Sequence, residues 1–199
     1  MSVLALKPNN LRKIRGCERQ VSGYVDVSNR EFPGAKRWTG IRRYVWRAVS
    51  RNVIQTTFDD FMKGARFSKK SGSWYRATDE VITVVELQKS QYGLQYYVNL
   101  ALWLRPLGEA TAPKEQVSHV RTRLEGLVGN EEGQLEALLD LDVPMPDSER
   151  AAKLTSFLEA HMRPALEAVV SVDSLRAGVG RKVVAASLVR GPAQGLLAV

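Results

Sequence analysis

The first sustained hydrophobic pattern in the chain begins at Val53. Its apolar residues recur at the three- and four-residue spacing of an amphipathic helix, at Ile54, Phe58, Phe61, Met62 and Ala65. Asp59 and the other polar residues of this stretch are expected to face away from the core. Gly64 weakens the last turn, so the pattern predicts a helix that ends near Ala65.

The stretch after this helix has the alternation and composition of β-strands. Trp74–Arg76, Val81–Lys89 and Leu94–Leu104 are rich in β-branched and aromatic residues. Polar turns at Ala77–Glu80 and Ser90–Gly93 separate these three segments. The pattern therefore predicts an antiparallel meander.

Apolar residues alternate along the two long strands of this meander. One face would carry Val81, Thr83, Val85, Leu87, Tyr96, Val98, Leu100 and Leu102. A four-residue turn would place Leu87 opposite Tyr96, which brings both apolar sets to the same side of the sheet. A slip of one residue would mix the two faces, and burial of one side forbids it. We therefore expect helices to cover this inner face.

The opposite, outer face would combine aromatic rings, amides and a carboxylate. In the same register Glu86 would lie opposite Tyr97, and Gln88 opposite Gln95. Such a mixture is typical of binding surfaces, but antiparallel sheets also commonly leave one polar face to solvent. The candidates for ligand binding on these strands are Glu86, Gln88, Tyr97, Asn99 and Trp103.

The second half of the chain has a mixed pattern. Residues 116–128 fit a helix as well as a strand, and residues 134–141 fit a helix as well as an edge strand. After two prolines, Asp147 or Ser148 can cap a long helix, which Pro164 should kink. Residues 178–199 are rich in Gly, Ala and Val, which suggests a loose strand or a flexible tail.

Three short segments of the meander have a distinctive composition: FSKKSGSWYR (67–76), QKS (88–90) and YVNL (97–100). With the preceding helix they resemble the bacterial family described as domain of unknown function 4304, over about residues 53–177. Two glycines usual in that family are replaced here by Arg66 and Ala101. The resemblance implies no functional residue, because none is established for the family.

The resemblance also implies a fourth strand within residues 116–128, which ends in an Arg-x-Arg pattern. Arg121 and Arg123 would then share one face of the sheet. They could bind an anionic ligand there, or pair with acidic neighbours at the surface.

Basic charge is concentrated in the first quarter of the chain. Residues 1–51 have a net charge of +9 and the remaining residues a net charge of −1. Basic and aromatic residues alternate in residues 36–47, which is the chemistry of nucleic-acid binding and also of membrane-surface segments. The nucleic-acid candidates are Lys36, Arg37, Trp38, Arg42, Arg43, Tyr44, Trp46 and Arg47.

Residues 1–50 show no sustained hydrophobic period, so a binding arm is only one interpretation of this stretch. The residues could instead be a disordered extension. Alternatively, the start of translation could be assigned too far upstream, since no Met occurs between Met1 and Met62.

Several kinds of chemistry have no support in the sequence. There is no phosphate-binding glycine loop, and His119 and His161 lack neighbours at metal-ligand spacing, so we expect no metal and no cofactor. A single cysteine, Cys17, and the lack of a membrane-spanning apolar run favour a cytoplasmic protein. Glu86 could act as an acid or base, but no partner for it is visible, so an enzyme is not favoured.

These patterns predict an α+β fold, an antiparallel β-meander of three to five strands with an N-terminal helix and a long C-terminal helix packed on one face. Residues 51–177 would form a single domain between a basic extension, 1–50, and the tail, 178–199. We expect a non-catalytic module that binds a protein or a small ligand on the outer sheet face. The alternatives are nucleic-acid binding through residues 36–47 and catalysis through Glu86.

Overall fold

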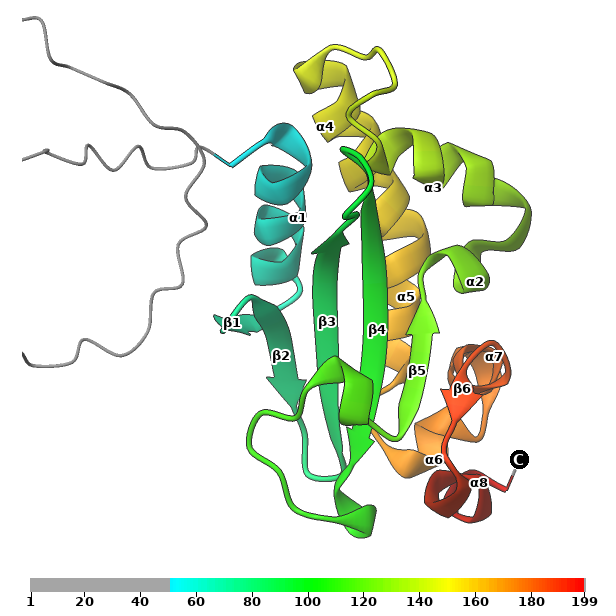
Figure 1. Ribbon diagram of the computed structural model, residues 1–199. Coiled ribbons are helices and arrows are strands. Elements are labelled where there is room, and N and C mark those ends of the chain that lie inside the picture. The colour runs from blue at the N-terminus through cyan, green and yellow to red at the C-terminus, as the bar shows by residue number, and fades with distance from the viewer. Residues whose placement is uncertain (1–50, 199) are drawn as a thin grey trace, which may run out of the picture. The chain divides into compact units, whose positions relative to one another are not determined.

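Six antiparallel strands form the sheet of the computed structural model, which describes residues 51–198 (Figure 1). They lie side by side in chain order, as β1 (Ser68–Lys70), β2 (Ser73–Ala77), β3 (Val81–Lys89), β4 (Tyr96–Leu104), β5 (Val120–Arg123) and β6 (Leu188–Val189). The α-helices are α1 (Val53–Gly64), α2 (Glu125–Val128), α3 (Glu132–Leu139), α4 (Asp147–Phe157), α5 (Arg163–Ala168), α6 (Val172–Leu175), α7 (Gly178–Ala185) and α8 (Gly191–Leu197). The α+β class is confirmed, but the sheet has more strands than expected. The candidates in residues 36–47 lie outside the described residues, and nucleic-acid binding through them stays a prediction.

Both ends of α1 are fixed by local motifs. The side chain of Asn52 accepts a hydrogen bond from the backbone N–H of Gln55 at 3.0 Å, and the backbone N–H of Asn52 donates to the Gln55 side chain at 3.2 Å, which forms a capping box. At the other end the N–H of Phe67 donates to the carbonyl of Met62 at 3.0 Å, in a Schellman motif. This motif needs a left-handed residue, and Arg66 supplies it with a φ of 63°.

Asp59 is buried, although the helical pattern placed it on the polar side of α1. Its side chain is only 4% exposed, and it pairs with Lys69 at 2.6 Å and with Arg51. Lys69 lies on β1, an element that the hydrophobic pattern did not reveal. The position of Asp59 therefore depends on a strand contact outside its own helix.

The pairing of β3 with β4 corrects the predicted register. Glu86 pairs with Asn99 rather than Tyr97, and Gln88 pairs with Tyr97 rather than Gln95. The turn is two residues longer than predicted, and its first residue donates a backbone hydrogen bond to its last at 2.8 Å. An even shift leaves every side chain on its own face. The predicted division into an inner and an outer face is therefore confirmed.

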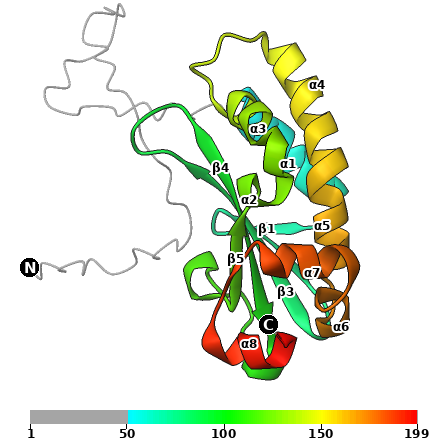
Figure 2. The same ribbon diagram turned by 90° about the vertical axis from the view of Figure 1, so that its right-hand side faces the viewer.

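The inner face carries the hydrophobic core. It buries Val81, Val85, Tyr96, Val98, Leu100 and Leu102 against apolar residues of the helices. Figure 2 shows α1, α4, α5 and α7 on this side of the sheet. The connector between β4 and β5 lies on the other side of the sheet, at the outer face.

The stretch predicted as one long C-terminal helix is divided into α4, a π-helical segment (Leu158–Met162) and α5. The cap residue is Pro146, not Asp147 or Ser148, and no side chain caps this end. Pro164 lies in the first turn of α5, where its missing N–H costs little. A wider π turn lies just before it and accommodates a residue that clashes inside a regular helix. The expected kink stays a prediction.

Residues 134–141, which the pattern left between helix and strand, fall mainly in α3. Arg150 of α4 holds the end of this helix and is only 1% exposed. Its Nη1 lies 2.9 Å from the carbonyl oxygen of Ala137, 3.1 Å from that of Leu138 and 2.8 Å from that of Asp140. Carbonyls at a helix end have no partner within the helix, so a buried guanidinium takes that role here.

Of the two edge strands, β1 was not predicted, and β6 lies in the C-terminal segment, for which a loose strand was one of two expectations. β1 is exposed at all three residues, so it leaves no mark in the hydrophobic pattern. Ser71 and Gly72 join it to β2 with φ angles of 51° and 90°, as two-residue hairpin turns require. β6 pairs with β5 only after the intervening helices have returned the chain to the sheet.

The C-terminal segment differs from the expected loose strand or flexible tail. It forms α7, β6 and α8, and it contributes Val183, Val184, Ala193 and Leu197 to the core. In α7, Gly180 lies so close to Ser174 that an added Cβ would be 2.0 Å from the Ser174 carbonyl oxygen. This end of the chain is therefore closely packed.

Candidate ligand-binding face

All seven predicted ligand-binding residues lie on the outer face, which is turned toward the viewer in Figure 1, and six of them lie close together. β4 lies between β3 and β5, so residues far apart in sequence become neighbours across it. The predicted fourth strand is confirmed as β5. The six residues are Glu86, Gln88, Tyr97, Asn99, Arg121 and Arg123.

Three of these residues form a row across the strands. Glu86 of β3 pairs with Asn99 of β4, and Asn99 pairs with Arg123 of β5. Paired Cα atoms in antiparallel sheets lie about 5 Å apart. The backbone positions of the carboxylate and the guanidinium are therefore about 10 Å apart, with an amide midway.

Hydrogen bonds and a ring contact orient the side chains near this row. Asn99 donates from Nδ2 to Gln88 at 2.9 Å, and the Tyr97 hydroxyl donates to Gln95 at 2.9 Å. The Arg123 guanidinium lies 4.7 Å from the centroid of the Tyr97 ring, as in a cation–π contact. Within residues 51–198 Arg123 donates no hydrogen bond, so the N–H groups of a positioned cation are available to a ligand.

Glu115 also belongs to this site, although no sequence pattern indicated it. It lies in η2 (Glu115–Val117), in the connector between β4 and β5, which crosses the outer face and contacts β3 and β4. Glu115 is 7% exposed and accepts a hydrogen bond from Nε of Arg121 at 2.8 Å. The connector has no periodic pattern, so only the folded chain reveals this second carboxylate. We call these residues the outer-face cluster: Glu86, Gln88, Tyr97, Asn99, Glu115, Arg121 and Arg123.

The pKa of Glu86 is raised above its ordinary value. Burial is the first cause, because it disfavours the ionised form, and the negative charge of Glu115 is the second. Within the described part of the chain, the Glu86 carboxyl accepts no hydrogen bond from another residue. It is therefore a partly buried acid that lacks a donor partner among these residues.

Trp103, the seventh candidate, lies apart from the cluster. It is four positions along β4 from Asn99, or about 13 Å. Its Nε1 donates to the carbonyl of Gly108 at 2.8 Å, and its ring lies 4.2 Å from that of His119. Burial, followed by the charge of Arg190, lowers the pKa of His119. These contacts fix the connector rather than form part of the cluster.

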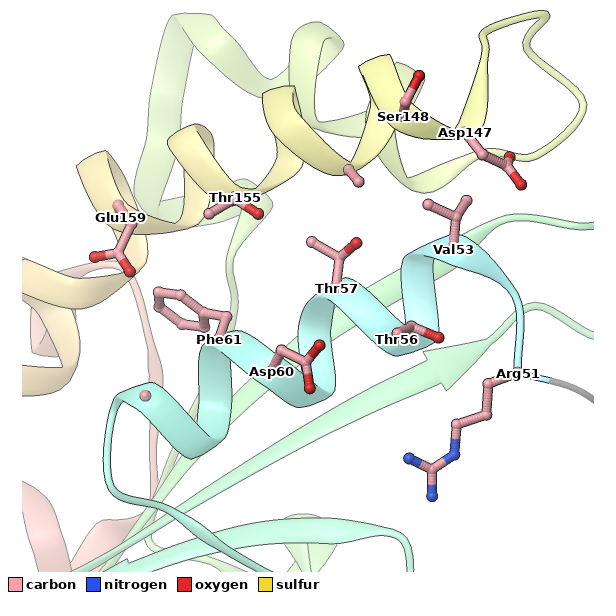
Figure 3. Close-up of a pocket in the computed structure, with 12 residues that line it drawn as sticks. Arg51, Val53, Thr56, Thr57, Asp60, Phe61, Asp147, Ser148, Thr155 and Glu159 are labelled. Carbon is pink, nitrogen blue, oxygen red and sulfur yellow. The ribbon is translucent and has the colours of Figure 1, made fainter.

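A separate groove of about 770 Å³ lies between α1 and α4. Figure 3 shows Phe61 pointing from α1 into this groove. Two of its carboxylates already have cationic partners, because Asp60 pairs with Lys63 and Glu159 pairs with Arg163. The outer-face cluster holds both a carboxyl and a guanidinium that have no hydrogen-bond partner among residues 51–198, so we take it as the candidate site.

Two further kinds of site are not found in the described residues. Among residues 51–198, no three His, Cys, Asp or Glu side chains are arranged to hold a metal ion. None of the helices in that part of the chain combines the length and the apolar character that a bilayer span requires.

The outer-face cluster lies within the part of the chain that a known family model matches. A family model described as "Domain of unknown function (DUF4304)" matches residues 58–168. This span contains every member of the outer-face cluster. No curated protein matches the chain, and no solved structure matches it either.

Proposed function

The chain belongs to the family described as domain of unknown function (DUF4304), and because that description assigns no activity, we propose a function from the geometry of the outer face. The protein is a non-catalytic module that binds a small polar ligand at the outer-face cluster. The ligand lies over β3, β4 and β5, beside the connector.

The state of Glu86 carries this proposal. Glu86 is partly buried without a donor among residues 51–198, and Glu115 adds a second negative charge beside it. A carboxyl whose pKa is raised by burial and by a neighbouring negative charge is common at functional sites.

Amide NMR spectra of the full chain, titrated with a set of small amines, carboxylates, amides and zwitterions, test the proposal. We expect the largest shifts at Glu86, Asn99 and Arg123, and we expect Asn99→Leu to remove them. Gln134→Leu, an exposed change on α3, is the control and should leave the shifts intact. Shifts confined to the α1–α4 groove, or no shifts with any compound, would overturn the proposal.

Glu115 supports a second candidate function, because it is a second carboxylate near Glu86 and no sequence pattern indicated one. A carboxyl with a raised pKa beside a carboxylate held by Arg121 is suited to proton transfer, with Glu86 as the acid or base. The test compares the rate of a reaction that the full chain catalyses with the rate in the Glu86→Gln variant. Loss of that reaction in Glu86→Gln would support catalysis, and an unchanged rate would exclude it.

A further inference from the structure

We propose that the outer-face cluster binds a small zwitterion, whose ammonium group pairs with Glu86 and whose carboxylate pairs with Arg123. This inference rests on the proposed function and specifies the class of ligand. The row of Glu86, Asn99 and Arg123 across three strands carries it.

The two ends of the row have opposite charges and free bonding capacity. Within residues 51–198 the carboxyl of Glu86 accepts no hydrogen bond, and the guanidinium of Arg123 donates none. Ammonium–carboxylate and carboxylate–guanidinium pairs are strong, charge-assisted hydrogen bonds. A ligand with both groups would satisfy both ends without changing the net charge of the site.

The neighbouring charges favour the same orientation. Glu115 adds negative charge beside Glu86 and so strengthens the attraction for an ammonium group. Arg121 is already occupied by Glu115, so Arg123 is the guanidinium left for a carboxylate. Glu125 lies close enough to interact with Arg123, but burial raises the pKa of this carboxyl, which weakens it as a competitor.

The spacing of the row limits the ligand to a small molecule. The two backbone positions are about 10 Å apart, and each charged contact takes about 2.8 Å. Each side chain also carries its charge several ångströms from its own Cα atom, so a short chain between the two charges of the ligand is enough to reach both ends. An unbranched aminobutanoate, with its charges at opposite ends, is therefore the first probe, and glycine and the corresponding aminohexanoate are its shorter and longer relatives.

The amide of Asn99 lies under the middle of such a ligand. Its Nδ2 is held by Gln88 at 2.9 Å, which leaves the carbonyl oxygen as an acceptor. Tyr97 supports Arg123 from one side through its ring. The site thus has an acidic end, a basic end that a ring contact positions, and a short polar segment between them.

Calorimetric titration of the full chain with glycine, aminobutanoate and aminohexanoate tests the inference, with butylamine and butanoate as the single-charge controls. We expect aminobutanoate to bind at least about ten-fold more tightly than either control, and its shorter and longer relatives measure the span that the site accepts. Glu86→Gln should reduce its affinity to that of butanoate, and Arg123→Gln should reduce it to that of butylamine. Lys153→Gln, on α4 behind the sheet, should change nothing.

Three results would overturn this inference: no binding of any aminoalkanoate, equal affinity for butylamine or butanoate, or full affinity in both variants. If other polar compounds still shift the amide signals of the outer face, the proposed binding function stands without the zwitterion. If no compound shifts them, both proposals fail.

Discussion

Arg121 donates a hydrogen bond from Nε to the carboxylate of Glu115 at 2.8 Å, and the two side chains come from opposite ends of the turn that enters β5. Their contact holds the connector on the outer face. It also keeps a negative charge near Glu86, whose pKa is raised. The electrostatic state of the site therefore depends on a loop that crosses the sheet.

The Glu115→Gln variant should lower the pKa of Glu86. It removes a nearby negative charge and frees the positive charge of Arg121, and both changes favour the ionised form of Glu86. The pKa should stay above its ordinary value, because burial is its first cause. NMR titration of the side-chain carboxyl signals measures this directly. Glu136→Gln, on the exposed side of α3, should leave the pKa of Glu86 unchanged. A higher pKa of Glu86 in Glu115→Gln would contradict the effect assigned to the charge of Glu115.

The Glu86→Gln variant should be more stable than the natural chain at neutral pH. A raised pKa in the folded state means that protonated Glu86 contributes stability at low pH, which is lost as the pH rises through that pKa. At pH 7 the charged group opposes folding, so the variant should gain at most about 1 kcal/mol, given the screening of a partly exposed group.

Urea unfolding at two pH values checks this gain. It should be present at pH 7 and disappear below about pH 4, where Glu86 is protonated in the natural chain as well. Equal stability of the two proteins at both pH values would mean that burial of this carboxyl has no energetic cost.

The Arg150→Met variant should lose about 3 kcal/mol of unfolding free energy. The change leaves buried carbonyls at the end of α3 without a donor, and each such group typically costs about 1–3 kcal/mol. Lys153→Met, one turn further along α4 at an exposed position, should stay within about 0.5 kcal/mol of the natural chain. Urea unfolding of both variants gives the comparison. Equal losses of unfolding free energy would show that the contacts of Arg150 with the carbonyls at the end of α3 do not stabilise the fold.

The Arg66→Gly variant should gain about 1 kcal/mol of unfolding free energy. Arg66 has a φ of 63°, a left-handed conformation that glycine adopts without a steric penalty. Arg66→Ala is the matched control, because alanine removes the side chain but keeps the strain. Thermal unfolding should rank glycine above arginine and alanine. If alanine stabilises as much as glycine, the long side chain is the cause instead.

The parts of the fold that are visible in the sequence are those with buried, periodic residues. Parity of apolar positions predicted the two faces of β3 and β4, and this division survived an error of two residues in the register because it depends only on odd and even positions. β1 escaped prediction because none of its residues is buried. The C-terminal helices are short, and their helical spacing has little room to repeat.

The sequence predicted only part of the candidate site, for a related reason. The parity of β3 and β4 assigned Glu86 and Asn99 to one face in advance. For Arg123 the sequence indicated only that it shares a face with Arg121, and the register of β5 against β4 was needed to bring it beside Asn99. Glu115 depends on how an irregular connector folds back, which no local pattern encodes. Trp103 was assigned to the correct face, but it lies at the far end of β4, where it holds that connector.

The chain order of the strands has a consequence for folding kinetics. From β1 to β5 each strand pairs with the next one along the chain, so each pairing closes a short loop at a small entropy cost. The sheet can therefore grow outward from the β3–β4 hairpin, in the manner of proteins with low contact order. The pairing of β5 with β6 must wait for all the helices between them, so we expect this edge to close last and to open first.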